Sequence, residues 1–503
     1  MKKQSRVTGI AISYITTIVR TLSRLILTPL YLRVLGVEEY GFYQYVFSVA
    51  CYATILDFGI SSVVNKFSIE YREKGNQKGV ENVMFYALMV TLGAATLIIL
   101  VGIAIAAGAP MIFGETVVER LTLTRQMLAL MIGELILLMF QHYFEGVILA
   151  AERYVTLRAV ALVQIFLRTA TTLLLLFSDV GVLSIAIGDF VGAALCLIYE
   201  IYYAKTNLKL KIKYHYRDGR LVIAIAKLSL ALAMQSVVSY LNSSIDKYVL
   251  GRYLSTAAVT VYSVGLTFST FFDEIPTAIQ RLYLPQAVKL VASGADGETL
   301  TSFVIKPGRY QFMLVGAVLG AFILFGRQFI CIWSGEETLD AWVVALFLMI
   351  PSVLPLIQNV CLSILTAMNK RIFRSYVLCG IALVNLVTTI ILVQQIGLIG
   401  AAVATCISLI LGNNIAMNVY YKRVIHINVG RLFKSILKGI LPCVIIATGI
   451  CAPLLLIPAE GFFWFVVECI IFCVVYASLL WVLGMNPEEK EQIGAKLGKR
   501  LRR

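Results

Sequence analysis

The sequence has 503 residues, of which 59% are hydrophobic and only 14% are charged, and its formal net charge is +15. Soluble globular proteins are about 45–50% apolar and about 25% charged, so this composition excludes a soluble enzyme, a disordered chain and a nucleic-acid-binding module. It predicts an all-α polytopic membrane protein. The apolar runs are about 20 residues long and do not alternate with polar residues, which excludes a transmembrane β-barrel.

Fourteen apolar segments are each long enough to cross a hydrocarbon layer of about 30 Å as a helix. They are residues 9–34, 40–64, 82–108, 124–149, 158–178, 181–204, 222–250, 257–283, 308–332, 341–366, 375–395, 397–421, 437–457 and 461–484. With the N-terminus inside, 31 Lys and Arg residues fall in inside segments, and only Arg33, Arg120 and Arg252 fall in outside loops. This bias predicts a multi-pass cell-membrane protein with both termini in the cytoplasm. No cleavable signal peptide is expected, because arginines interrupt the first apolar run.

The sequence repeats itself at an offset of 215–217 residues. Val34-Leu35-Gly36 recurs as Val249-Leu250-Gly251, and Arg158 corresponds to Arg374. Six spans separate equivalent points, so the two halves have the same orientation, as in transporters that bind substrate between parallel repeats. The predicted parts are a six-helix lobe (1–204), a basic cytoplasmic linker (205–221), a second six-helix lobe (222–421), an interfacial linker with helices 13 and 14 (422–484), and a basic cytoplasmic tail (485–503).

The first span carries a polar stripe that includes two arginines. Thr17, Arg20, Arg24 and Thr28 are spaced by three or four residues, which places them on one face of an α-helix. Each arginine near the middle of the membrane costs roughly 2.5–3.5 kcal/mol, so the pair is expected to face a wet cavity. Guanidinium groups match the oxygens of phosphate or pyrophosphate, which predicts an anion site. The alternative is a pair of structural arginines bonded to carbonyls or carboxylates of neighbouring spans.

Three further spans are predicted to contribute residues to the same cavity. The seventh span carries Gln235, Ser239 and Asn242 on the same face as Asp246, and these groups suit a wall that contacts sugar or water. Polar bonding between helices is an equal alternative for any one of them. The second span contributes Tyr45 and Tyr52, whose rings could stack on sugars. In the eighth span, Arg281 follows Pro276 and adds a basic residue near a predicted kink.

Carboxylates inside the spans are candidates for binding H⁺ or Na⁺ as coupling ions. The candidates are Asp57, Glu134, Asp189, Asp246, Asp273 and Glu274. Arg168 and Asp189 both lie mid-span in the first lobe, and they are predicted to form an ion-paired cluster with Glu134. Internal charge compensation is at least an equal explanation for these residues.

No catalytic constellation, metal site or cofactor is predicted. The sequence has no GxxxxGK[ST] loop, its three histidines are scattered, and its ten cysteines form no CxxC pair. No sizeable outside loop carries paired carboxylates. We therefore do not expect an enzyme.

Two segments resemble a known family of transporters. TPLYLRVLGVEEYGFYQYV (28–46) resembles the junction of spans 1 and 2, and QRLYLPQAVKL (280–290) resembles the end of span 8, of the Wzx-type oligosaccharide-lipid flippases. These belong to the multidrug/oligosaccharidyl-lipid/polysaccharide (MOP) superfamily. The likeness covers essentially the whole chain.

The resemblance implies a flippase that moves an undecaprenyl-pyrophosphate-linked oligosaccharide across the bacterial cytoplasmic membrane by alternating access. It would map the family's cationic cavity onto Arg20 and Arg24, and less firmly onto Arg281. The implied partners are the lipid-linked oligosaccharide, membrane lipids and glycan-assembly enzymes, with no nucleic acid. The alternatives are a lipid II flippase, a multidrug exporter of the same superfamily, a polysaccharide polymerase, and a scaffold for glycan-assembly enzymes.

Overall fold

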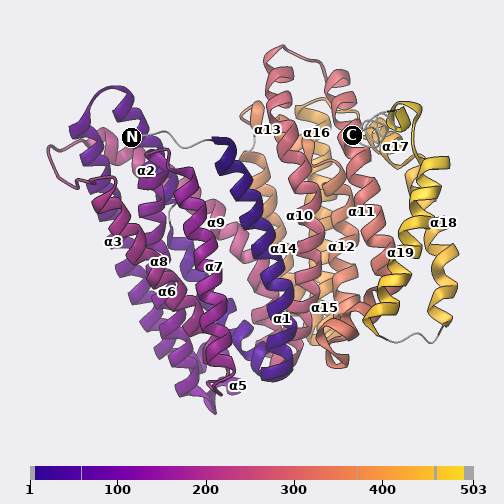
Figure 1. The fold of residues 1–503 in the computed structure, drawn as a ribbon, viewed down its shortest axis with the longest axis horizontal. Helices are drawn as coiled ribbons and strands as arrows, with labels where there is room; N and C mark the ends of the chain where they lie inside the picture. The colour runs from indigo at the N-terminus through magenta and orange to yellow at the C-terminus, as the bar shows by residue number, and fades with distance from the viewer. Residues whose placement is uncertain (1–5, 58, 371, 458–460, 492–503) are drawn as a thin grey trace. The chain divides into compact units, whose positions relative to one another are not determined.

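The computed structural model describes residues 6–57, 59–370, 372–457 and 461–491, and all of its regular elements within these ranges are helical. The chain divides into two compact units, residues 1–260 and 261–503. Within each unit the long helices run side by side (Figure 1).

The described residues of unit 1 form nine helices and one 3-10 segment. They are α1 (Arg6–Ala50), η1 (Cys51–Asp57), α2 (Ile60–Glu73), α3 (Gln77–Ala107), α4 (Ala109–Phe113), α5 (Glu115–Val118), α6 (Leu121–Ala150), α7 (Tyr154–Leu176), α8 (Leu183–Thr206) and α9 (Gly219–Tyr253). Helix α10 (Thr256–Ala292) crosses the boundary between the units.

Unit 2 contains the remaining elements, including two π-helical segments, η3 and η5. They are α11 (Gly297–Ser334), η2 (Glu336–Thr338), α12 (Ala341–Ile357), α13 (Val360–Ala367), α14 (Ile372–Ile396), α15 (Leu398–Leu409), η3 (Ile410–Ala416), α16 (Met417–Val424), α17 (Val429–Leu437), α18 (Ile440–Cys451), η4 (Ala452–Leu456), α19 (Phe462–Leu479) and η5 (Leu480–Gly484).

Ten helical segments of the described residues are long and apolar enough to cross a membrane. They correspond to ten of the fourteen predicted spans. The other four predictions, residues 9–34, 40–64, 222–250 and 257–283, fall on α1, η1, α2, α9 and α10, which are the elements that carry the polar stripes. Of these elements, α1, α9 and α10 are nevertheless long helices.

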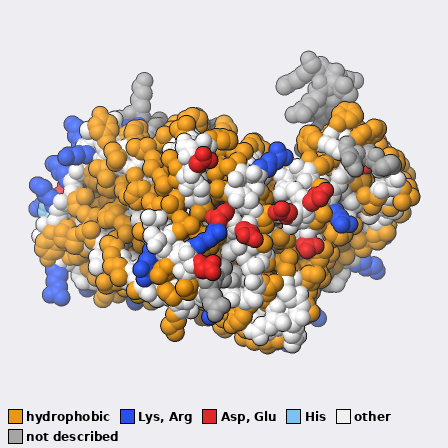
Figure 2. All heavy atoms as spheres, turned by 90° about the horizontal axis from the view of Figure 1, so that it is seen from below, with side chains coloured by type: hydrophobic (Ala, Val, Ile, Leu, Met, Phe, Trp, Pro, Cys, Tyr) orange, Lys and Arg blue, Asp and Glu red, His pale blue; other side chains and the backbone are white. Residues whose placement is uncertain are grey.

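Large apolar side chains are exposed on the outer surfaces of the helices. Phe166, Leu174 and Ile198 are each more than 60% exposed, and hydrophobic side chains cover much of the face drawn in Figure 2. A water-soluble surface rarely exposes so much contiguous apolar area. These surfaces are therefore suited to contact with lipid.

The first two predicted spans belong to one bent element. Helix α1 continues through both, and it bends at Gly36, where φ is 83°. This backbone conformation is accessible to glycine at little steric cost. The second predicted span then ends as a helix at Ala50 and continues through η1 and Gly59 into α2. The prediction of one regular helix over residues 40–64 was therefore wrong.

The two compact units meet at residue 260, after helix α9. Helix α9 packs against α1 and η1. Gly251 lies against the ring of Tyr45, and the Cys51 Sγ lies 3.0 Å from the Ser244 Oγ. These contacts make α9 part of the first compact unit.

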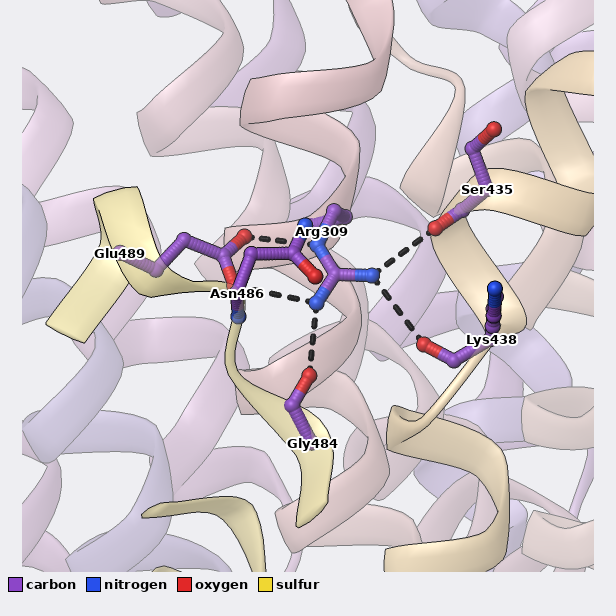
Figure 3. A network of polar contacts seen from close by, with 6 residues as sticks. All are labelled: Arg309, Ser435, Lys438, Gly484, Asn486 and Glu489. Atoms are coloured by element: carbon purple, nitrogen blue, oxygen red, sulfur yellow. Dashed lines mark hydrogen bonds and ion pairs between the residues drawn. The ribbon is translucent and has the colours of Figure 1, made fainter. Parts of the chain in front are cut away.

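Unit 2 is held together at one end by a buried arginine of α11 (Figure 3). Arg309 donates to both carboxylate oxygens of Glu489, at 2.6 and 3.0 Å. It also donates to the carbonyls of Ser435, Lys438 and Gly484, at 2.8, 3.1 and 2.7 Å. One side chain thus joins α11 to α17, to the end of η5 and to the segment that follows it.

Candidate functional site

The polar stripe of α1 divides into an exposed part and a buried part. Arg20 and Arg24 are exposed, as is Thr17, whereas Thr28 and Tyr31 are only 7% and 5% exposed. The buried part packs against other residues of unit 1, and the centroid of the Tyr31 ring lies 6.0 Å from that of the Tyr40 ring. The two guanidinium groups predicted to bind an anion therefore lie on the exposed part of the helix.

A lysine of α9 adds a third positive charge to this region. The Lys247 Nζ donates to the Gln44 Oε1 at 3.0 Å, and the Gln44 Nε2 donates to the Tyr40 hydroxyl at 2.8 Å. Arg24 lies within electrostatic range of both Lys247 and Tyr40. We call Arg20, Arg24 and Lys247 the basic group. The hydrogen bonds through Gln44 and Tyr40 hold Lys247 in place.

The two tyrosines proposed to contact sugars have different surroundings. Tyr45 is 0% exposed, and its hydroxyl donates to the Phe113 carbonyl at 3.0 Å. Its ring packs edge-on against Phe113, with centroids 5.2 Å apart. In this arrangement Tyr45 is a packing residue, contrary to the prediction that it lines a cavity. Tyr52, in η1, is partly exposed and lies within electrostatic range of Asp246.

The remaining candidates for substrate binding are spread over both units. Asn242 lies in α9 and is partly exposed. The side chains of Gln235 and Ser239, from the same helix, lie outside the described residues. Arg281 lies in α10, in unit 2, and is exposed.

A second polar group of unit 1, which we call the acid–arginine cluster, consists of Tyr43, Glu134, Arg168 and Asp189. Arg168 of α7 forms an ion pair with the buried Asp189 of α8. The Tyr43 hydroxyl donates to the other oxygen of Asp189 at 3.1 Å. Glu134 of α6 lies within electrostatic range of Arg168 and Asp189. The predicted ion pair between Arg168 and Asp189 is therefore confirmed, and Glu134 lies near this pair.

The other ion-coupling candidates do not join this cluster. Asp246 of α9 is 2% exposed and lies beside Lys247 in the sequence. Asp273 and Glu274 lie in α10 of unit 2, and the Asp273 Oδ1 is buried with no hydrogen-bond partner among the described residues. The side chain of Asp57 lies outside the described residues. Within the described ranges, no three His, Cys, Asp or Glu residues are grouped as a metal site.

Sequence reasoning did not reveal the contact between Lys247 and Gln44. Lys247 follows Asp246 on α9, and its neighbour Gln44 lies more than 200 residues earlier in the chain. A signal was present in the sequence, because a lysine and an aspartate side by side in an apolar helix must both find polar partners.

The family is identified by comparison with known proteins. The polysaccharide biosynthesis protein family matches residues 7–288, which is more than half of the chain and contains α1, α9 and the basic group. The chain belongs to the polysaccharide biosynthesis protein family. It is thus a multi-pass membrane protein of a polysaccharide biosynthesis family.

Curated relatives include an uncharacterized membrane protein, EpsK, of Bacillus subtilis. The two sequences are 24% identical over 485 residues, and the alignment covers 93% of each chain. A probable flippase, AglR, of Haloferax volcanii is 24% identical over 272 residues, or 51% of this chain and 53% of the relative.

Solved structures show that the fold is similar to those of a lipid II flippase and a multidrug transporter. The inward closed conformation of the lipid II flippase MurJ has a TM-score of 0.72 at 16% identity, over 94% of this chain and 98% of that one. An inward-facing multidrug resistance MATE transporter has a TM-score of 0.63 at 12% identity. The alignment covers 83% of this chain and 97% of that chain.

Proposed function

We propose that this protein is a flippase that moves an undecaprenyl-pyrophosphate-linked oligosaccharide to the outer leaflet of the bacterial cytoplasmic membrane, for the synthesis of a surface polysaccharide such as capsule, O-antigen or a teichuronic-type polymer. The observation that carries the proposal is the basic group of unit 1, in which Arg20 and Arg24 are exposed on a helix expected to cross the membrane. The family supports a role in polysaccharide biosynthesis, and a relative described as a probable flippase supports the activity.

The basic group would bind the pyrophosphate of the substrate. Two planar guanidinium forks bind phosphate oxygens in pairs, and the Lys247 ammonium adds a point charge. The bond from Lys247 to Gln44 limits the positions of the ammonium, so less side-chain freedom is lost when the anion binds. Tyr52 and Asn242 would contact sugars, together with Gln235 and Ser239 of α9. Thr17 would line the same face of α1, and Arg281 would supply a basic residue from the second half.

The energetics favour export. The two predicted six-helix lobes would rock to expose the site alternately to each side, with both termini in the cytoplasm. Moving negative charge out of a cell whose interior is negative is downhill by about 2.3 kcal/mol per charge at 100 mV. Coupling ions, bound at Glu134, Asp189, Asp246, Asp57, Asp273 or Glu274, would change that balance.

The test replaces the basic residues. Charge-assisted hydrogen bonds contribute about 1.5–3 kcal/mol each, so Arg20→Ala with Arg24→Ala should weaken binding of the lipid-linked pyrophosphate by at least about a hundredfold. Surface polysaccharide should be lost while the amount of protein in the membrane is unchanged. Lys247→Gln should give a smaller loss of the same kind.

A matched control is Arg158→Ala, which removes an exposed arginine of α7 outside the basic group and should leave polysaccharide unchanged. Normal polysaccharide in the double arginine variant would refute the proposed role. Restoration of peptidoglycan synthesis in a strain without its lipid II flippase would favour that activity, and drug sensitivity of a deletion strain with intact glycan would favour multidrug export.

A further inference from the structure

A buried glutamate of unit 1 lies outside both polar groups described above. Glu200 is in α8, which packs along α6 and α7, and its side chain is inside the unit. The residue is 1% exposed, and its Oε2 has no hydrogen-bond partner among the described residues. Another carboxylate of the described residues, Glu145 of α6, lies within electrostatic range of Glu200.

Other buried carboxylates of unit 1 have positively charged or protonatable partners. Asp189 pairs with Arg168, and Glu81 lies 2.6 Å from the His215 Nε2. Asp246 lies within electrostatic range of Lys247. Glu200 differs from these three residues, because the group that acts on it has the same charge.

The surroundings of Glu200 contain few other titratable groups. On α6, His142 lies about one turn before Glu145. On α8, the thiol of Cys196 lies about one turn before Glu200. At this level α7 offers Arg158, which is exposed, and Arg153 precedes the helix. The Thr156 Oγ1 donates to the Tyr203 hydroxyl at 3.4 Å, which connects α7 to α8 close by.

A carboxylate removed from water is strongly destabilised unless a cation compensates its charge, and a second carboxylate nearby increases this cost. Protonation of one of the two groups removes both penalties with a single proton. A proton requires one oxygen ligand, whereas calcium or magnesium requires at least six ligands. The unsatisfied Oε2 of Glu200 is the buried oxygen that can take the proton.

We propose that Glu200 and Glu145 form a proton-binding site, in which Glu200 holds the proton in this conformation. The pair then carries one negative charge, and release of the proton to water leaves two. Glu200 and Glu145 lie about 9 Å and 8 Å, along the helix axis, from the ends of α8 at Thr206 and α6 at Ala150. These ends precede the two loops predicted to be cytoplasmic, which gives the proton a short route to water by way of Glu145.

The consequence for transport rests on the proposed flippase function. A conformation that admits water to Glu200 favours release of the proton, and the packed conformation favours its uptake. Proton binding at this site therefore biases the conformational equilibrium and couples it to cytoplasmic pH. This site is separate from the acid–arginine cluster, in which an arginine already compensates the buried aspartate.

The first experiment is infrared spectroscopy of the purified full-length protein at neutral pH, and it does not depend on transport. Glu200→Gln should remove one carbonyl band of a protonated carboxylic acid. Glu145→Gln should leave that band in place with a shifted frequency, because it changes the neighbour and not the protonated group. Glu70→Gln, which replaces an exposed carboxylate bonded to Lys74, should leave the carboxylic acid region unchanged.

Two results would overturn the proposal. One is that Glu200→Gln removes only bands of an ionised carboxylate. The other is a sodium-dependent shift of the carboxylate bands that disappears in Glu200→Gln, because this would identify a metal cation as the ligand.

The second experiment measures translocation of a fluorescent lipid-linked pyrophosphate in proteoliposomes as a function of pH. Glu200→Gln should remove the pH dependence while translocation continues, and a pH profile identical to that of the wild-type protein would contradict coupling through this site. If Arg20→Ala with Arg24→Ala has no effect and the Glu200 band is present, the proposed flippase function fails and the proton site stands. If the band is absent and the arginine variants lose transport, the reverse holds.

Discussion

The buried Arg309–Glu489 pair gives a quantitative test of how the C-terminal helices are held in unit 2. Both side chains are about 5% exposed, and Arg309 uses its donors on Glu489 and on three carbonyls (Figure 3). Replacing Glu489 with Ala leaves the guanidinium buried with carbonyl partners only. Breaking a buried ion pair by removing one partner costs about 3–5 kcal/mol.

That cost should appear locally, because Arg309 joins α11 to α17 and to the end of η5. We expect Glu489→Ala to lower the free energy of local opening of residues 429–437 by about 3 kcal/mol, which corresponds to amide hydrogen exchange at least about a hundredfold faster. Hydrogen exchange measured by mass spectrometry on the purified protein would detect it. Amides of α6 and α8 in unit 1 should exchange at the wild-type rate.

The neighbouring Glu488→Ala is the matched control, because Glu488 is exposed and its removal should change exchange by little. The pair is shielded from solvent, so raising the salt concentration should not reproduce the effect of the mutation. Equal exchange rates in the Glu488 and Glu489 variants would show that the ion pair does not hold α17, and the reasoning from burial would be refuted.

Three other substitutions test the packing of unit 1. Asp189→Asn should destabilise the protein by about 1.5–3 kcal/mol, because Arg168 loses its charged partner but is 44% exposed and can be partly solvated, and thermal unfolding in detergent should show a larger loss than for the exposed Asp179→Asn. Gly41→Ala should prevent accumulation of folded protein, because its Cβ would lie 1.8 Å from the Thr256 carbonyl oxygen; Gly93→Ala, where a Cβ meets nothing within 4 Å, should accumulate normally in the same size-exclusion assay. Asp218 accepts from the backbone N–H of Leu221 at the start of α9, and this bond holds the pKa of Asp218 below its usual range. Its contribution to stability is therefore present above the unfolded-state pKa of about 3.9 and is lost as the pH falls, so Asp218→Ala should cost about 1 kcal/mol at neutral pH and less in acid, as measured by the pH dependence of thermal unfolding.

Sequence patterns predicted the elements that depend on apolar length, because that signal is local. Ten predicted spans correspond to helices, and the association of Arg168, Glu134 and Asp189 followed from the cost of isolated charges in apolar segments. The same patterns did not reveal that the second span passes through a 3-10 segment. That change of geometry depends on packing of η1 against α9, which is distant in the sequence.

Burial of individual polar residues could not be predicted, because a helical stripe does not show which part of it is covered by another helix. Tyr45 and Tyr52 are one heptad apart, yet Tyr45 is enclosed by Phe113 and Gly251 while Tyr52 is partly exposed. The stripe on α1 likewise is exposed at Arg24 and covered at Thr28. Whether each of these side chains is buried depends on contacts with residues that are distant in the sequence.

The internal repeat shows where charge was placed in only one half. In the first half, Tyr43, Arg168 and Asp189 lie in the second, fifth and sixth predicted spans. In the second half, Tyr262, Asn385 and Thr405 lie in the equivalent eighth, eleventh and twelfth spans. Asn385 is 217 residues after Arg168, and Thr405 is 216 residues after Asp189. In unit 2 the Thr405 Oγ1 lies 3.2 Å from both the Tyr262 hydroxyl and the Asn385 Oδ1. The same three helices thus meet through neutral groups in one half and through an ion pair in the other. A neutral amide and hydroxyl can join helices without titrating, so binding of a coupling proton at this position is a property that only the first half can have.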